Sequence, residues 1–233
     1  MLRVLRNIIL TAIIVGSTPS AACELFGDEA RYRIEHEMFG RIGEEILTLR
    51  CLDDLVIVDR TVDIDVQVFM ASFYQRHARY TEVWRGDRLI RFQGDTDDDG
   101  KPMTLVAEVS LDDLIVIKGP KTLIEAPLTA MPTDPWHLKL AHRTLLFDRL
   151  DGHVSDVEVT DLGTERLTID GHVIDARKFA VSGPRDQESW FDRASGLWLK
   201  SIIAHSSGDI TITRQNWRLP QHVAEAGADG QEG

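Results

Sequence analysis

Acidic residues gather in one short stretch of this 233-residue sequence, Asp95-Thr96-Asp97-Asp98-Asp99-Gly100. Asp95, Asp97 and Asp99 alternate before a glycine, as at the start of a calcium loop, where alternate carboxylates direct oxygens toward one ion. An EF-hand would need glutamate at the twelfth position, where this sequence has Val106. The preferred interpretation is a hairpin turn made of good turn-forming residues. Asp95, Asp97 and Asp99 are the calcium candidates, and no other metal site is expected.

Other catalytic patterns are weak. His137 and His142 are five residues apart, which does not place both on one helix face as a zinc pair requires. His36 alternates with Tyr32 and Ile34, which predicts a buried core histidine. The sequence has no Gly-x-Ser-x-Gly elbow, phosphate loop or dinucleotide fingerprint. We therefore expect a protein that is not an enzyme and uses no cofactor.

Period-two alternation of apolar and polar residues dominates the chain and predicts strands with one buried face. The clearest strand runs from Leu55 to Val68, and its polar face carries Asp59, Thr61, Asp63, Asp65 and Gln67. Tight turns such as Asp170-Gly171 and Ser195-Gly196 separate later strands. The predicted fold is mainly β, a strongly curved antiparallel sheet that forms an open half-barrel.

One short helix interrupts this pattern. Thr133-Asp134-Pro135 resembles a helix start, with a capping side chain before a proline at the first helical position. The sequence therefore predicts a helix over Trp136 to His142.

The apolar face of the curved sheet offers a ligand site. Large open barrels hold elongated apolar ligands on such a face. In the alternative interpretation the same side chains only pack against the helix and one another. The predicted lining residues are Val62, Ile64, Val66, Val68, Trp84, Trp136 and Trp190.

The amino-terminal residues have the pattern of a signal peptide. Arg3 and Arg6 precede the apolar run Ile8 to Val15, and small residues follow up to Ala22. The run is short for a membrane span, although an uncleaved anchor is the alternative. We expect a signal peptide at 1–22, a single antiparallel β domain at 23–218 and a disordered tail at 219–233.

The sequence contains two cysteines, Cys23 and Cys51. In an exported protein they are expected to form a disulfide. Cys23 directly follows the predicted cleavage point, so a lipid anchor on Cys23 is the alternative. Two unpaired thiols are the remaining possibility.

The formal net charge is −12. Such acidity opposes binding to nucleic acid or to anionic membrane surfaces. It also keeps an exported protein soluble, which is the simpler explanation.

Several short motifs together resemble an exported bacterial family, domain of unknown function 6134. The resemblance spans about Tyr32 to Arg214, and Phe191 stands where the family usually has tyrosine. The motifs are Tyr32-x-Ile34, Ile42-Gly43-Glu44, Glu82-x-Trp84, Gly86-Asp87-Arg88-Leu89, Thr96 to Lys101, Trp136 and Trp190-Phe191-Asp192.

The family implies no activity. Its organisation is similar to the lipoprotein-carrier (LolA/LolB) half-barrel, which implies handling of apolar ligands or envelope lipids by fold analogy alone. The sequence thus predicts a periplasmic cell-envelope protein of a Gram-negative bacterium that binds an apolar or lipid-like ligand. The alternatives are an interaction module for an envelope protein, or a hydrolase with a cleft that joins His137 or His142 to a carboxylate and a serine. The oligomeric state is left open.

Overall fold

The computed structural model describes residues 29–68 and 71–217. Within these residues the chain is mainly strand, with one short 3₁₀ helix, η1. The elements are β1 (Ala30–His36), β2 (Gly40–Leu52), β3 (Leu55–Val68), β4 (Ala71–Arg85), β5 (Arg88–Asp98), β6 (Lys101–Val109), β7 (Leu114–Lys118), β8 (Leu123–Pro127), β9 (Met131–Pro132), η1 (Leu138–Leu140), β10 (Leu145–Phe147), β11 (Val154–Asp156), β12 (Glu158–Ile169), β13 (His172–Ser182), β14 (Gln187–Asp192), β15 (Trp198–Ile203) and β16 (Ile210–Arg214).

Thirteen strands form one antiparallel sheet in the order β12-β13-β14-β15-β16-β1-β2-β3-β4-β5-β6-β7-β8. Neighbours in the sheet are neighbours in sequence, except that β1 pairs with β16. The end strands β8 and β12 do not pair with each other, so the sheet is not closed. This confirms the predicted mainly β fold with a large, open antiparallel sheet.

The alternation of apolar and polar residues, and the residue types in the turns, explain why these strands form where they do. The predicted bounds of the Leu55–Val68 strand agree with β3. The turn at Asp99-Gly100 and the turn at Asp170-Gly171 have positive φ at both residues, 55° and 77° in the first and 50° and 77° in the second. Paired positive φ values match the right-handed twist of a hairpin and require residues such as aspartate and glycine.

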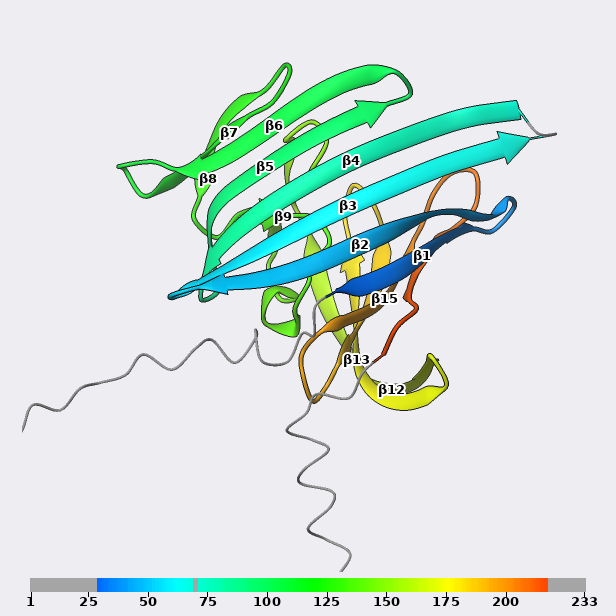
Figure 1. Cartoon of the computed structure of the whole chain (residues 1–233). Coiled ribbons are helices and arrows are strands. Elements are labelled where there is room, and N and C mark those ends of the chain that lie inside the picture. The colour runs from blue at the N-terminus through cyan, green and yellow to red at the C-terminus, as the bar shows by residue number, and fades with distance from the viewer. Residues whose placement is uncertain (1–28, 69–70, 218–233) are drawn as a thin grey trace, which may run out of the picture.

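The insert, residues 128–157, lies between β8 and β12 and fills the curve of the sheet. It carries η1 and a small sheet of β9, β10 and β11, in which β9 and β10 run parallel. Figure 1 shows the short strand β9 near the long strands β3 and β4 in this view. Met131, Trp136, Leu140 and Phe147 of the insert belong to the main hydrophobic core together with residues of both halves of the sheet. The concave face is thus covered by the protein's own chain.

The predicted helix over Trp136 to His142 is wrong in extent. Only Leu138–Leu140 is helical, and its N-cap is His137, whose side chain accepts a hydrogen bond from the Lys139 N–H. The reason is that the hairpin between β14 and β15 takes the backbone groups a longer helix would use. The Trp136 carbonyl accepts from the Trp198 N–H at 3.2 Å, and the Leu138 N–H donates to the Gly196 carbonyl at 2.7 Å.

Within the described residues, no helix is long and apolar enough to span a membrane. The predicted signal peptide at 1–22, Cys23 and the predicted tail at 219–233 lie outside those residues. Cys51 lies near the end of β2, where its side chain is exposed. The pairing of Cys23 with Cys51 therefore stays a prediction.

Candidate functional site

Three charged side chains lie on the inner face of the sheet, on neighbouring strands. Glu45 of β2, Arg60 of β3 and Glu82 of β4 are each 1% exposed. Arg60 lies opposite Leu47 and Tyr80, which makes Glu45 and Glu82 its diagonal neighbours. Arg60 Nη1 donates to Glu45 Oε1 at 2.8 Å, and its Nε lies 3.4 Å from Glu82 Oε1. Register alone thus places one cation between two carboxylates in the core.

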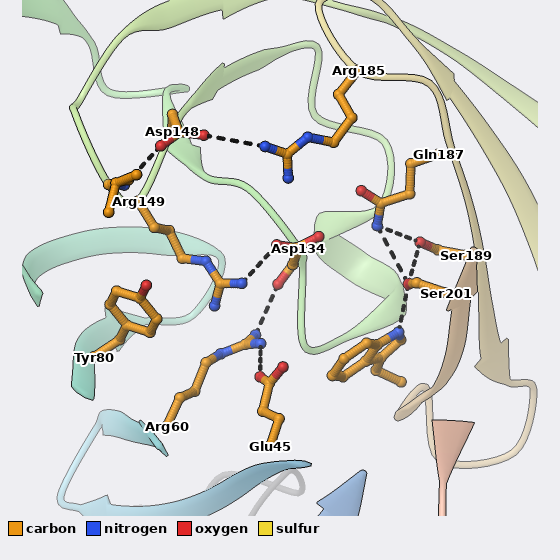
Figure 2. A network of polar contacts seen from close by, with 12 residues as sticks. Glu45, Arg60, Tyr80, Asp134, Asp148, Arg149, Arg185, Gln187, Ser189 and Ser201 are labelled. Atoms are coloured by element: carbon orange, nitrogen blue, oxygen red, sulfur yellow. Dashed lines mark hydrogen bonds and ion pairs between the residues drawn. The ribbon is translucent and has the colours of Figure 1, made fainter. Parts of the chain in front are cut away.

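The insert adds a second half to this buried network (Figure 2). Arg60 Nη2 donates to the backbone carbonyl of Asp134 at 2.8 Å. Arg149 Nη2 donates to Asp134 Oδ2 at 2.6 Å, and its guanidinium lies 4.7 Å from the centre of the Tyr80 ring. Asp134 has a φ of 64°, a conformation that these two arginines hold in place. The network therefore fastens the start of the insert to the sheet.

Burial and neighbouring charges have opposite effects on the pKa values of two carboxyl groups in this network, Glu82 and Asp134. Burial raises the pKa of Glu82 above its ordinary value, and the nearby Arg60 and Arg149 offset this only in part. Burial would also raise the pKa of Asp134, but Arg149, Arg185 and Arg60 outweigh it and lower the pKa. Of these two carboxyl groups, Asp134 is consequently the firmly ionised one, and Glu82 is the one more easily protonated.

The insert residues that follow Asp134 line part of a cleft of about 880 Å³. Part of its lining is the segment Trp136 to Leu140, which follows Asp134 in the chain, together with His142. The rest of the lining comes from Val56 at the start of β3, the β4–β5 turn and the β14–β15 turn. Its lining residues are Val56, Gly86, Asp87, Trp136, His137, Leu138, Lys139, Leu140, His142, Arg193, Ala194, Ser195 and Gly196.

A close contact between His137 and Gly196 fixes the cleft wall against the β14–β15 turn. Gly196 has a φ of +76°, and a Cβ placed there would lie 2.5 Å from His137 Nε2. Asp192 orders the same turn, since its Oδ2 accepts from the Ser195 N–H at 2.8 Å and its carbonyl accepts from the Gly196 N–H at 2.8 Å. The segment that carries His137 and the β14–β15 turn therefore both have an ordered backbone.

The cleft brings together a histidine, a serine and a carboxylate, as the hydrolase hypothesis required. The serine and the histidine, however, are not hydrogen-bonded to each other through their side chains. Ser195 Oγ donates to Asp192 Oδ2 at 2.5 Å, and His137 Nδ1 accepts from the Lys139 N–H at 3.0 Å. Burial lowers the pKa of His137, and the Lys139 ammonium lowers it further. A nucleophile bonded to a general base is the signature of such catalysis, and Ser195 and His137 are not arranged in that way.

The predicted lining residues divide between two clusters. Val62, Val66, Trp84 and Trp136 share the main core, and Ile64 packs against it. Val68 is the last residue of β3. Trp190 lies instead in a second cluster with Ile169, Ile174, Ala176, Leu199 and Trp217. Of the predicted lining set, Trp136 reaches the cleft.

The remaining candidates also have definite places. His36 is 6% exposed and hydrogen-bonded to Ser207, which confirms the predicted core histidine. Asp95 and Asp97 are exposed residues of strand β5, and Asp99 lies in the turn that follows. The described part of the chain has no group of three or more His, Cys, Asp or Glu side chains that could hold a metal ion.

Sequence reasoning missed the buried network. A signal was present, because Glu45, Arg60 and Glu82 occupy inward positions of strands whose other inward residues are mostly apolar. A charged residue at a buried position of a strand needs a partner of opposite charge, so each of these three residues predicts such a partner nearby.

Comparison with known proteins supports the fold. No curated protein matches the chain. The crystal structure of a β-barrel-like protein of domain of unknown function DUF1849 from Brucella abortus is similar, with a TM-score of 0.60 at 12% sequence identity. The similarity covers 82% of this chain and 96% of that chain. Residues 32–215 match the family described as Domain of unknown function (DUF6134). The chain therefore belongs to the DUF6134 family.

Proposed function

We propose that this protein is an exported cell-envelope protein that binds an apolar or lipid-like ligand without catalysing a reaction. The binding site in this proposal is the cleft beside the insert and not the concave face of the sheet. The insert already covers that face with Trp136, Leu140 and Phe147. The signal-peptide pattern of residues 1–22 supports the cellular location.

The cleft is the observation that carries the proposal. Its volume of about 880 Å³ lies within the range of small-molecule sites. Val56, Trp136, Leu138 and Leu140 give it apolar walls, and the charged groups lie beside them. The hydrogen bonds of Ser195 and His137 support a binding role over a hydrolytic one.

Uptake of fluorescent fatty acids and phospholipids by delipidated protein tests the proposal. Ala194→Trp places a large ring at an exposed position of the cleft, so we expect it to reduce uptake. Ala204→Trp, at an exposed position after β15, is the matched control and should bind like the unchanged protein. No uptake by the unchanged protein, or equal uptake by both variants, would remove the cleft as a ligand site.

A second candidate function, an interaction module of the envelope, has one observation in its favour. β12 is an end strand of the sheet and is 12 residues long, and its residue Leu162 is 48% exposed. Exposed sheet edges accept an added strand from a partner. A photo-crosslinking residue at Thr164 should then capture an envelope protein in cells, whereas the same residue at Thr104, within the sheet, should not.

A further inference from the structure

Within the described part of the chain, the unpaired charges around the cleft are positive, whereas the net charge of the molecule is negative. The chain carries a formal net charge of −12. In the cleft, the carboxylate of Asp87 is paired with Arg143, whose Nη2 lies 2.8 Å from Asp87 Oδ2 and also donates to the Asp87 carbonyl at 3.0 Å. Lys139 and Arg193 are exposed, and neither side chain has an ion-pair partner among the residues that the structure describes. Two uncompensated cations therefore line a cleft in an acidic protein.

These two cations come from two different segments of the cleft lining, and both segments have ordered backbones. Lys139 is the middle residue of η1, which is capped by His137. Arg193 is in the β14–β15 turn, where its N–H donates to the Asp175 carbonyl at 3.0 Å. The neighbouring Asp192 accepts from the backbone of Ser195. The long side chains can therefore adjust over the cleft while their attachment points stay fixed.

Apolar residues of the main core also line the cleft. Val56, Trp136 and Leu140 are buried cleft residues, with exposures of 4%, 4% and 3%. Leu138 is only half-buried and lies beside Lys139. The cleft thus combines an apolar floor with a positively charged rim, and that combination matches a molecule with an apolar part and an acidic end.

We propose that the ligand of this cleft is an amphiphile with one anionic group, a carboxylate or phosphate, which Lys139 and Arg193 bind while its apolar part lies against Trp136 and Leu138. This inference rests on the proposed ligand-binding function and specifies the class of ligand. The anionic group is held by charge-assisted hydrogen bonds, which are stronger than neutral ones. Because both cations are exposed, binding weakens as the salt concentration rises.

Calorimetric titration of delipidated protein with three probes tests the inference. Dodecanoate has the tail and the charge, dodecyl maltoside has the same tail with an uncharged head, and inorganic phosphate has the charge alone. We expect dodecanoate to bind roughly tenfold more tightly than dodecyl maltoside, since two exposed ion pairs each contribute modestly. Equal affinity for the two dodecyl compounds would overturn the role of the anionic group and leave the proposed function intact.

The other outcomes are equally distinct. Phosphate binding as tight as dodecanoate binding would show a site for free anions and would overturn the amphiphile. Binding of none of the three would remove both the inference and the proposed function.

A matched pair of double variants assigns the effect to the two cations. Lys139→Gln with Arg193→Gln should weaken dodecanoate binding roughly five- to tenfold and leave dodecyl maltoside unchanged. Lys118→Gln with Lys121→Gln makes the same change in net charge at exposed positions away from the cleft and should have little effect. Equal weakening by both double variants would mean that overall charge, and not these two residues, governs binding. Lys139→Arg with Arg193→Lys should retain most of the affinity.

Discussion

Among single residues, those of the buried charge network hold the insert against the sheet, and the insert in turn lines the cleft. Arg60 contacts Glu45, Glu82 and the backbone of Asp134, and its side chain is fully buried. Desolvation of a buried ion pair is costly, so such a network contributes little net stability compared with apolar packing. Each member of the network is nevertheless needed for stability once the others are present, because its removal leaves an unpaired buried charge, which is strongly unfavourable.

Arg60→Met should therefore lower the free energy of unfolding by about 3–5 kcal/mol, because it leaves Glu45 and Glu82 buried without their cation. Urea denaturation measures the change. Arg50→Met is the control, since the pair between Arg50 and Asp59 is exposed and should contribute less than about 1 kcal/mol. Adding Glu45→Gln and Glu82→Gln to Arg60→Met should recover part of the lost stability. A loss for Arg60→Met no larger than that of Arg50→Met would contradict the account.

Glu82 should also give stability a specific pH dependence. Its pKa in the folded protein lies above the ordinary value of 4.5, mainly because of burial. Between 4.5 and the raised pKa, the folded state binds more protons than the unfolded state, so stability falls as pH rises through that window. In Glu82→Gln this fall should be absent when urea denaturation is repeated from acid to neutral pH. Parallel pH curves for the two proteins would show that Glu82 does not titrate in this way.

Among the elements, the insert and the β14–β15 turn line the cleft together with the start of β3 and the β4–β5 turn. The strand pattern and the turn at Asp170-Gly171 were predictable from sequence, because alternation and turn chemistry are local properties. The hairpin turn predicted over Asp95 to Gly100 is shorter in the structure, at Asp99-Gly100, because Asp95 to Asp98 belong to β5. The shortened helix was not predictable. Its extent depends on hydrogen bonds from Trp198 and to Gly196, which are distant in sequence from Trp136 and Leu138.

Gly196→Ala tests the contact between the two elements. Alanine at a φ of +76° is strained, and its Cβ would also overlap His137. Gly171→Ala is the matched control, with a φ of +77° and no atom within 4 Å of the added Cβ. We expect Gly171→Ala to cost about 1 kcal/mol from backbone strain alone and Gly196→Ala to cost more. Equal costs in thermal or urea unfolding would mean that the contact with His137 adjusts freely.

For the whole molecule, the sequence predicts an open, curved antiparallel sheet with a ligand on its concave face, whereas the ligand site proposed now is the cleft lined by the insert. Alternation shows which residues of β3 face inward and does not show what covers them. The insert covers them, and its Asp134 and Arg149 reach the sheet through contacts with Arg60 and Tyr80, which are distant in sequence. Charges at inward positions, as at Arg60, were the available clue that something polar lies opposite.

The predicted pairing of Cys23 with Cys51 concerns the whole chain as well. Intact mass spectrometry of the exported protein should give a mass two hydrogens below that of the reduced chain without its signal peptide. Reduction should restore those two hydrogens, and Cys51→Ser should abolish the difference. A diacylglyceryl mass on Cys23 would contradict the disulfide and show lipid anchoring.

Native mass spectrometry of protein purified from the envelope fraction of its host shows directly whether this protein binds a lipid-like ligand. We expect a fraction of the protein to carry an adduct with the mass of an anionic lipid, which is lost on denaturation and reduced in Ala194→Trp. Protein that is entirely free of adduct, and that takes up none after exposure to host lipids, would contradict the proposed binding.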